Sequence, residues 1–135
     1  MTDEQLDVAR RHVDWHAQKF GYAKPNTRFL QGYIERLGDL GLEPGSFDII
    51  VSNCVINLVP DKHAAFAEAF RVTRPGGRLS VSDIVTTEPL PELARASVAA
   101  YVACLGGASM LDDYLAAIRD AGYTDARVTS DVAYA

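Results

Sequence analysis

Several features that define common protein classes are scarce or missing in this chain of 135 residues. It has only two cysteines, Cys54 and Cys104, and they lie far apart, so a disulfide framework is not expected. No apolar run approaches the roughly 18–20 residues that a membrane span needs. The N-terminal residues have a helical pattern rather than that of a signal peptide. These absences predict a soluble, cytoplasmic protein with no membrane partner.

An excess of basic charge is also missing. Lys and Arg number 13 against 18 Asp and Glu, which gives a net charge of −5. The basic residues are scattered and do not alternate with aromatic side chains, so the sequence predicts no nucleic-acid partner. The hydrophobic share of 48% and the charged share of 23% are typical of a globular protein. We expect residues 1–135 to form a single domain.

Glycine-rich cofactor-binding motifs are absent as well. The sequence contains no GxGxxG, no P-loop and no GxSxG. A doubly wound domain that binds a nucleotide-like cofactor normally opens with a strand and a glycine-rich turn. This chain opens on a helix instead, for which Thr2 and Gln5 form a candidate capping box. We therefore expect an α/β fold that lacks its first strands.

The remaining sequence alternates between strand and helix patterns. Strands are predicted at residues 27–31, 47–52, 79–84 and 126–129, and helices between them, including one from Pro60 onward and one that runs toward Cys104. The apolar run Ile49-Ile50-Val51 predicts a strand buried on both faces, as in a parallel sheet. The alternation predicts an α/β fold with a mainly parallel sheet.

Polar residues and a thiol follow the predicted strands. Residues 32–35, residues 53–55 and Asp83 stand at carboxyl ends, where parallel sheets bind ligands. Each has a plainer interpretation. Cysteine is often buried and inert, so packing is the commoner role for Cys54 or Cys104 taken alone. Glu35 could be an exposed carboxylate, and Asp83 could cap a turn. The residues alone leave these alternatives open.

Two segments carry a resemblance to a large enzyme family. Residues 47–53 (FDIIVSN), followed after a helix by residues 71–79 (RVTRPGGRL), resemble the middle of a class I methyltransferase. Two further stretches are more specific. Residues 51–62 (VSNCVINLVPDK) and residues 104–108 (CLGGA) are similar to the two cysteine segments of the arsenite methyltransferases. Residues 32–38 and the opening Met1-Thr2 also fit, so the resemblance covers essentially the whole chain.

The resemblance implies a partial, Rossmann-like class I methyltransferase fold with S-adenosylmethionine as cofactor. The reaction would be methyl transfer to trivalent arsenic, with arsenite or thiol-bound As(III) as the partner. Matched by position, Cys54 and Cys104 look like the catalytic thiolates that bind As(III), a soft and thiophilic metalloid. The resemblance further implies that Met1, Ile34 and Glu35 lie near the adenine. Asn53 would lie near the methionine part of the cofactor.

The sequence also departs from the family's pattern. The family's glycine-rich loop and ribose-binding acidic residue would stand upstream of Met1, and its additional N-terminal cysteines and C-terminal domain have no counterpart. In the family's strand order, 3-2-1-4-5-7-6, the strands matched here are 3, 4, 5 and 6, and only 4 and 5 are neighbours. Such a sheet keeps unpaired edges. We therefore expect self-association or a complementing N-terminal fragment, and little activity of this polypeptide alone.

Two other functions stay open at this stage. The chain could be a metalloid-binding or vestigial module in which the cysteines hold arsenic without methyl transfer. It could also belong to a class I methyltransferase that acts on a small organic substrate.

Overall fold

The computed structural model describes residues 2–92, 98–99 and 104–133. The chain divides into two compact units, Met1–Tyr33 and Ile34–Ala135. Among the described residues, no helix has both the length and the apolar character needed to cross a membrane. The single domain over residues 1–135 stays a prediction.

The first unit contains two short helices, α1 (Asp3–Arg11) and α2 (Val13–Lys19). The predicted capping box is confirmed: Thr2 Oγ1 accepts from the Gln5 amide at 3.3 Å, and Gln5 Oε1 accepts from the Thr2 amide at 3.0 Å. The strand predicted at residues 27–31 is wrong, since these residues form irregular backbone. A strand exists only where a second strand takes its backbone hydrogen bonds, and the described residues supply none there.

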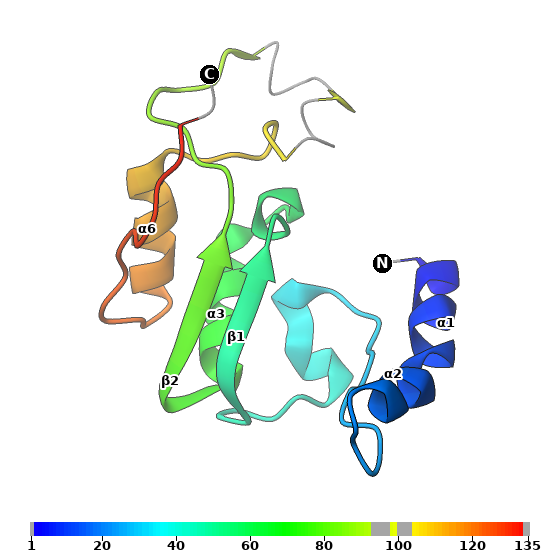
Figure 1. Cartoon of the computed structure of the whole chain (residues 1–135). Helices are drawn as coiled ribbons and strands as arrows, with labels where there is room; N and C mark the ends of the chain where they lie inside the picture. Colours follow the sequence, from blue (N-terminus) through cyan, green and yellow to red (C-terminus); the bar gives the residue numbers. More distant parts are fainter. Residues whose placement is uncertain (1, 93–97, 100–103, 134–135) are drawn as a thin grey trace. The chain divides into compact units, whose positions relative to one another are not determined.

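The second unit is built on a two-stranded parallel sheet. Strand β1 (Phe47–Asn53) pairs with β2 (Thr73–Ser82), and the register places Ile50 opposite Leu79 and Asn53 opposite Ser82. The connection between them contains the short helix η2 (Ile56–Leu58) and the helix α3 (Lys62–Val72), which lies along the sheet in Figure 1. The predicted α/β fold with a partial parallel sheet is confirmed.

The two faces of this sheet differ sharply. Leu79 and Val81 pack into the core beside α3. On the opposite face Ile49 is 58% exposed and Val51 is 74% exposed. The prediction that this strand is buried on both faces is therefore wrong. Successive side chains in a strand point to opposite faces, and only one face is covered by helices of the described chain.

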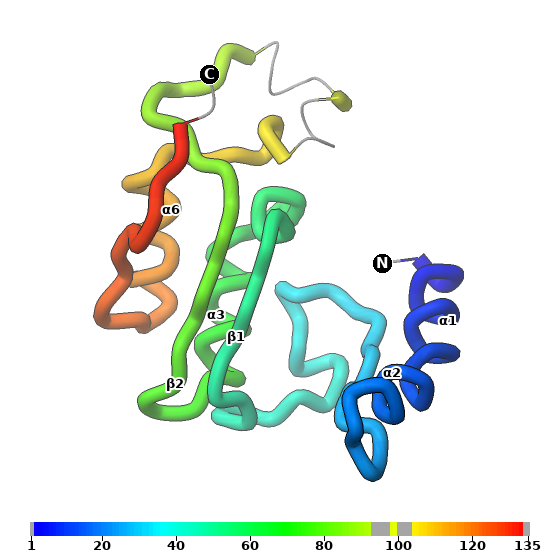
Figure 2. Tube along the Cα trace, viewed as in Figure 1, coloured from blue at the N-terminus to red at the C-terminus, as the bar shows by residue number. Residues whose placement is uncertain are grey.

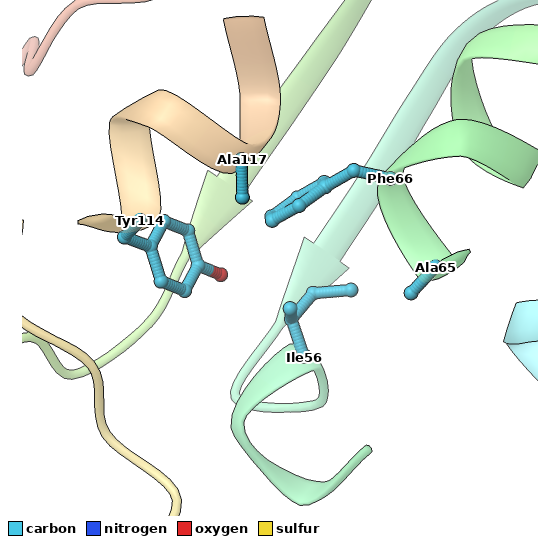
Figure 3. Packing of buried hydrophobic residues seen from close by; sticks show 5 residues of the cluster. All are labelled: Ile56, Ala65, Phe66, Tyr114 and Ala117. Carbon is cyan, nitrogen blue, oxygen red and sulfur yellow. The ribbon is translucent and has the colours of Figure 1, made fainter. Parts of the chain in front are cut away.

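The core lies between α3, α6 (Leu111–Asp120) and the covered face of the sheet. Figure 3 shows how Phe66 from α3 and Tyr114 from α6 face one another, with their ring centroids 5.3 Å apart in an edge-to-face arrangement. Phe66 and Val72 have no exposed surface. The buried cluster consists of Ile56, Ala65, Phe66, Tyr114 and Ala117.

The short helix η1 (Ile34–Leu40) is fastened to α3 by one carboxylate. Glu68 Oε2 accepts from the Gly38 amide at 2.8 Å, and Glu68 Oε1 pairs with Arg71 Nε at 2.6 Å. The hydrogen bond from Arg71 is the main cause of the lowered pKa of Glu68. This contact holds the part of η1 that follows a kink at Arg36, whereas Ile34 and Glu35 precede that kink.

Two remaining predictions concern the C-terminal half. The helix predicted to run toward Cys104 lies largely outside the described residues. The strand predicted at residues 126–129 is wrong, since that backbone is irregular. The Ala126 carbonyl accepts from Arg119 Nη2 at 3.0 Å, so a side chain takes the bond that a neighbouring strand would need.

Candidate functional site

The candidate site lies at the carboxyl ends of β1 and β2. Because the strands are parallel, Asn53 and Ser82 end at the same edge of the sheet. The Cys54 amide donates to the Ser82 carbonyl at 2.8 Å, which continues the ladder by one residue. Cys54 then leaves the strand direction with a left-handed φ of 53°. The turn therefore places an exposed thiol directly at the end of the sheet.

The second cysteine meets the first at this edge. Figure 2 shows the segment of residues 104–110 passing over the carboxyl ends of the two strands. Cys104 Sγ donates to the Cys54 carbonyl at 3.4 Å, although the two residues are 50 positions apart in the chain. Both cysteines are free. The structure thus brings together the two residues that the sequence predicted as thiolate ligands.

Both cysteines also hold strained backbone conformations. Within the described part of the chain, Cys54 and Cys104 are the only residues other than glycine with positive φ, at 53° and 61°. The left-handed region costs an L-residue about 1–2 kcal/mol, because its Cβ crowds the following carbonyl oxygen. Strain of this kind persists where the surroundings enforce it, and it concentrates at functional sites.

The surroundings of Cys104 change the acidity of its thiol. Burial raises the pKa of the Cys104 thiol, and the nearby Cys54 and Asp83 raise it further. Cys104 therefore resists ionisation on its own. A partner that takes the thiol proton as it binds, or a positive group nearby, would favour the thiolate.

A polar network lies beneath the thiols. Asp83 Oδ2 accepts from the Asn57 amide at 3.1 Å and from the Tyr114 hydroxyl at 3.0 Å, while Asp83 Oδ1 accepts from the Ile84 amide at 3.2 Å. Burial, followed by the charge of Asp83, raises the pKa of Tyr114 well above its usual range. Asp83 therefore does more than cap a turn, since it joins the end of β2 to η2 and to α6.

A second contact fastens the Cys104 segment from the side of α3. Lys62 Nζ donates to the Gly107 carbonyl at 2.7 Å. Burial lowers the pKa of Lys62, and the charge of Asp83 opposes that shift. The ammonium group thus lies in a partly desolvated position next to the cysteine segment.

The residues predicted to bind the cofactor differ from one another in burial. Ile34 is partly buried against the core cluster, and Glu35 is half-buried beside it on η1. Asn53 is exposed at the end of β1, one residue before Cys54. Met1 lies outside the described residues. Ile34 and Glu35 are adjacent on η1, whereas Asn53 stands at the end of β1. A carboxylate and a carboxamide can each form hydrogen bonds with the polar groups of S-adenosylmethionine, and an apolar side chain suits its purine.

Sequence reasoning assigned no role to Asn57, Lys62 or Tyr114. The signal for Asn57 was present, because a single carboxamide interrupts the apolar run at residues 55–59. Lys62 and Tyr114 gave no such signal, since their partners lie 45 and 31 residues away. Across residues 2–92, 98–99 and 104–133, no group of three or more His, Cys, Asp or Glu could hold a metal ion.

Comparison with known proteins defines the class. A family model described as a methyltransferase domain matches residues 1–123. The chain therefore belongs to the methyltransferase domain family.

Within that class the resemblance narrows to one group. The chain is 48% identical to an arsenite methyltransferase of Aquipseudomonas alcaligenes over 131 residues, which cover 97% of this chain and 37% of that protein. It is 48% identical to the Homo sapiens arsenite methyltransferase over 108 residues, which cover 80% of this chain and 29% of that protein. The predicted resemblance to the arsenite methyltransferases is confirmed. The chain spans about a third of the length of these relatives.

A solved structure agrees with the sequence comparison. An arsenic(III) S-adenosylmethionine methyltransferase from Chlamydomonas reinhardtii superposes with a TM-score of 0.86 at 45% identity. The match covers 93% of this chain and 42% of that protein. The fold of the described chain is thus that of part of a methyltransferase domain.

Proposed function

We propose that this chain uses Cys54 and Cys104 as the two thiolates that hold trivalent arsenic for S-adenosylmethionine-dependent methyl transfer. The observation that carries the proposal is the meeting of the two cysteine segments, with Cys104 Sγ 3.4 Å from the Cys54 carbonyl. The left-handed backbone at both cysteines supports it, because strain tends to mark functional sites. The arsenite methyltransferases among its relatives support the substrate.

The binding step is a balanced ligand exchange. Arsenite, As(OH)3, reacts with two thiols to form two As–S bonds, and each thiol proton leaves with an arsenic hydroxide as water. No oxidant or reductant is needed. The proton of Cys104 therefore has an acceptor even though the pKa of this thiol is raised. Arsenic keeps its lone pair, which is the nucleophile for methyl transfer.

The cofactor supplies, when bound, an electrophilic methyl group on a sulfonium sulfur. We propose that Asn53 holds its amino-acid part, next to Cys54, and that Ile34 and Glu35 lie against its adenine. Met1 is proposed for the adenine from the family resemblance alone. The main work of these residues is alignment, because the reaction needs arsenic, methyl carbon and sulfur in one line.

Arsenite titration tests the paired thiolates. Free thiols are counted with a chromogenic thiol reagent, and we expect both cysteines to be lost together. Cys54→Ser and Cys104→Ser serve as matched controls, each of which should bind at least about 10-fold more weakly, since the second As–S bond is effectively intramolecular. Unchanged affinity in Cys54→Ser would show that the paired-thiolate proposal is wrong.

Cofactor binding separates the remaining functions. We expect this polypeptide alone not to saturate at millimolar S-adenosylmethionine, a regime of about −4 kcal/mol. The reason is that Glu35 and Asn53 are the only polar side chains proposed for the cofactor in the described chain. Calorimetry that shows micromolar affinity would contradict this. Arsenic binding without methyl transfer, even after addition of a complementing segment, would indicate a metalloid-binding module. Cofactor binding without arsenic binding would favour a small-molecule methyltransferase.

We further propose that the exposed face and free edge of the sheet engage a second copy or a complementing segment. Ile49 and Val51 supply the apolar surface for this contact. Light scattering over a concentration series measures it. We also propose a cytoplasmic location, where free thiols such as these are kept reduced.

A further inference from the structure

Asn57 links the segment that follows Cys54 to the segment that begins at Cys104. The residue is 1% exposed, and it lies on η2, three residues after Cys54. Asn57 Nδ2 donates one hydrogen bond to the Ile84 carbonyl at 2.6 Å and a second to the Cys104 carbonyl at 3.2 Å. Both acceptors are carbonyl oxygens, so a reversed amide would set oxygen against oxygen. The orientation of the carboxamide is therefore fixed.

The backbone of Asn57 makes two further contacts. Its amide donates to Asp83 Oδ2 at 3.1 Å, which holds η2 at the end of β2. The Asn57 carbonyl lies so close to Gly107 that a Cβ at that glycine would overlap it. Asn57 thus contacts the cysteine segment of residues 104–107 at two points, one through the side chain and one through the backbone.

Burial of this carboxamide is not explained by stability alone. Its Oδ1 atom is fully buried and finds no hydrogen-bond partner among the described residues. An unpaired buried oxygen is unfavourable, and an apolar side chain of similar size would avoid that penalty. What only an amide supplies at this position is two donors that reach two different segments at once.

We propose that Asn57 is a positioning residue that holds Cys104 over Cys54 and so sets the coupling between the two thiols. This inference rests on the proposed function of the cysteine pair. Without the Nδ2 contact, the Cys104 segment would keep the Lys62–Gly107 contact and the contact of Cys104 Sγ with the Cys54 carbonyl. It would lose the hydrogen bond from Asn57 to the Cys104 backbone carbonyl. Each thiol would remain present and reactive, but the affinity of the two thiols together for arsenic would fall.

The test uses phenylarsine oxide, a probe that requires two thiols. The oxide reacts with two thiols to give a cyclic dithioarsenite and one water, so the two thiol protons leave with the oxide oxygen. We expect Asn57→Ala in the full 135-residue chain to bind this probe about 10-fold or more weakly than wild type. Alkylation of the individual thiols by iodoacetamide should keep rates within about a factor of 3, because each cysteine keeps its own chain position.

A double-mutant cycle shows whether the effect belongs to the coupling. In a Cys54→Ser background, Asn57→Ala should cause no further loss of probe affinity, because no pair remains to be positioned. The matched control is Tyr123→Phe, which removes a part-buried tyrosine hydroxyl from its hydrogen bond with Thr73 and lies outside the network beneath the thiols. That variant should lower the melting temperature and keep the probe affinity of wild type.

The outcomes separate this inference from the function on which it rests. Wild type that binds the probe no better than either single-cysteine variant would remove the paired-thiolate function itself. Tight binding by wild type together with unchanged binding by Asn57→Ala would overturn only the positioning role. If Asn57→Ala does not fold, the side-chain amide protons of Asn57 are followed by NMR in wild type. Slow exchange that persists after probe binding supports the clamp, and exchange as fast as that of a free carboxamide rejects it.

Discussion

Two regions of the second unit differ in polarity, packing and backbone strain. The core between α3, α6 and the sheet is apolar and close-packed, with Phe66 and Val72 fully buried and Phe66 packed against the Tyr114 ring. The carboxyl edge of the same sheet is polar, partly exposed and strained, with left-handed backbone at Cys54 and Cys104. The core therefore stabilises the fold, whereas the strained backbone at the two cysteines reduces that stability.

Tyr114 joins the two regions. Its ring is part of the core cluster, whereas its hydroxyl donates to Asp83 in the network beneath the thiols. A change in the core can therefore reach the site through one side chain. Substitutions in the two regions should change the free energy of unfolding by different amounts, and this difference can be measured.

The largest effect is expected in the core. Phe66→Ala should lower the free energy of unfolding by about 3–5 kcal/mol, because it removes a fully buried ring and leaves a cavity between α3 and α6. Urea denaturation measures the change. A loss below about 1 kcal/mol would show that α3 and α6 are not held by this contact.

A matched pair of valines compares the two faces of the sheet. Val81→Ala should cost about 1–2 kcal/mol, since Val81 packs against the core cluster. Val51→Ala should change stability by less than about 0.5 kcal/mol, since Val51 is 74% exposed. Equal losses at the two positions would mean that the outer face is also covered in solution, by a second copy or by another segment.

The hydroxyl of Tyr114 should give a pH-dependent effect of about 1 kcal/mol. The pKa of Tyr114 is raised in the folded chain by burial and by Asp83, so the unfolded chain ionises first, at about pH 10. The stabilising contribution is then fully present below that pH and is lost as the pH rises beyond it. The stability difference between wild type and Tyr114→Phe, measured by denaturation from pH 8 to 11, should shrink in that window. A difference that stays constant would contradict the assignment.

The smallest effect on stability is expected at the carboxyl edge of the sheet, where the variant with the smaller side chain should be the more stable one. Cys54→Gly should be more stable than Cys54→Ala by about 0.5–1 kcal/mol, because glycine adopts a φ of 53° without strain. Both variants lack the thiol and should lose arsenic chelation equally, so the pair isolates the backbone term. Thermal unfolding measures the difference. A more stable alanine variant would show that the left-handed turn at Cys54 is not retained.

The elements that the sequence predicted well are those fixed by local chemistry. The capping box of Thr2 and Gln5, the helix that begins after Asp61 and the strand at residues 47–52 depend on neighbours a few positions away. The strands predicted at residues 27–31 and 126–129 failed because a strand needs a partner that propensity does not supply. The exposure of Ile49 and Val51 was missed for a related reason, since an apolar run does not reveal what covers it.

The candidate site also combines features that the sequence predicted with features that only the tertiary structure shows. Sequence alone supplied the two thiols, the position of Cys54 after a predicted strand, and the likeness of both segments to the cysteine segments of the arsenite methyltransferases. Only the tertiary structure decided that Cys104 lies on the Cys54 carbonyl, and that Asn57, Asp83 and Tyr114 form the network beneath them. The physical reason is distance along the chain. A hydrogen bond between residues 26 to 50 positions apart depends on how whole elements pack, and local pattern carries no record of that packing.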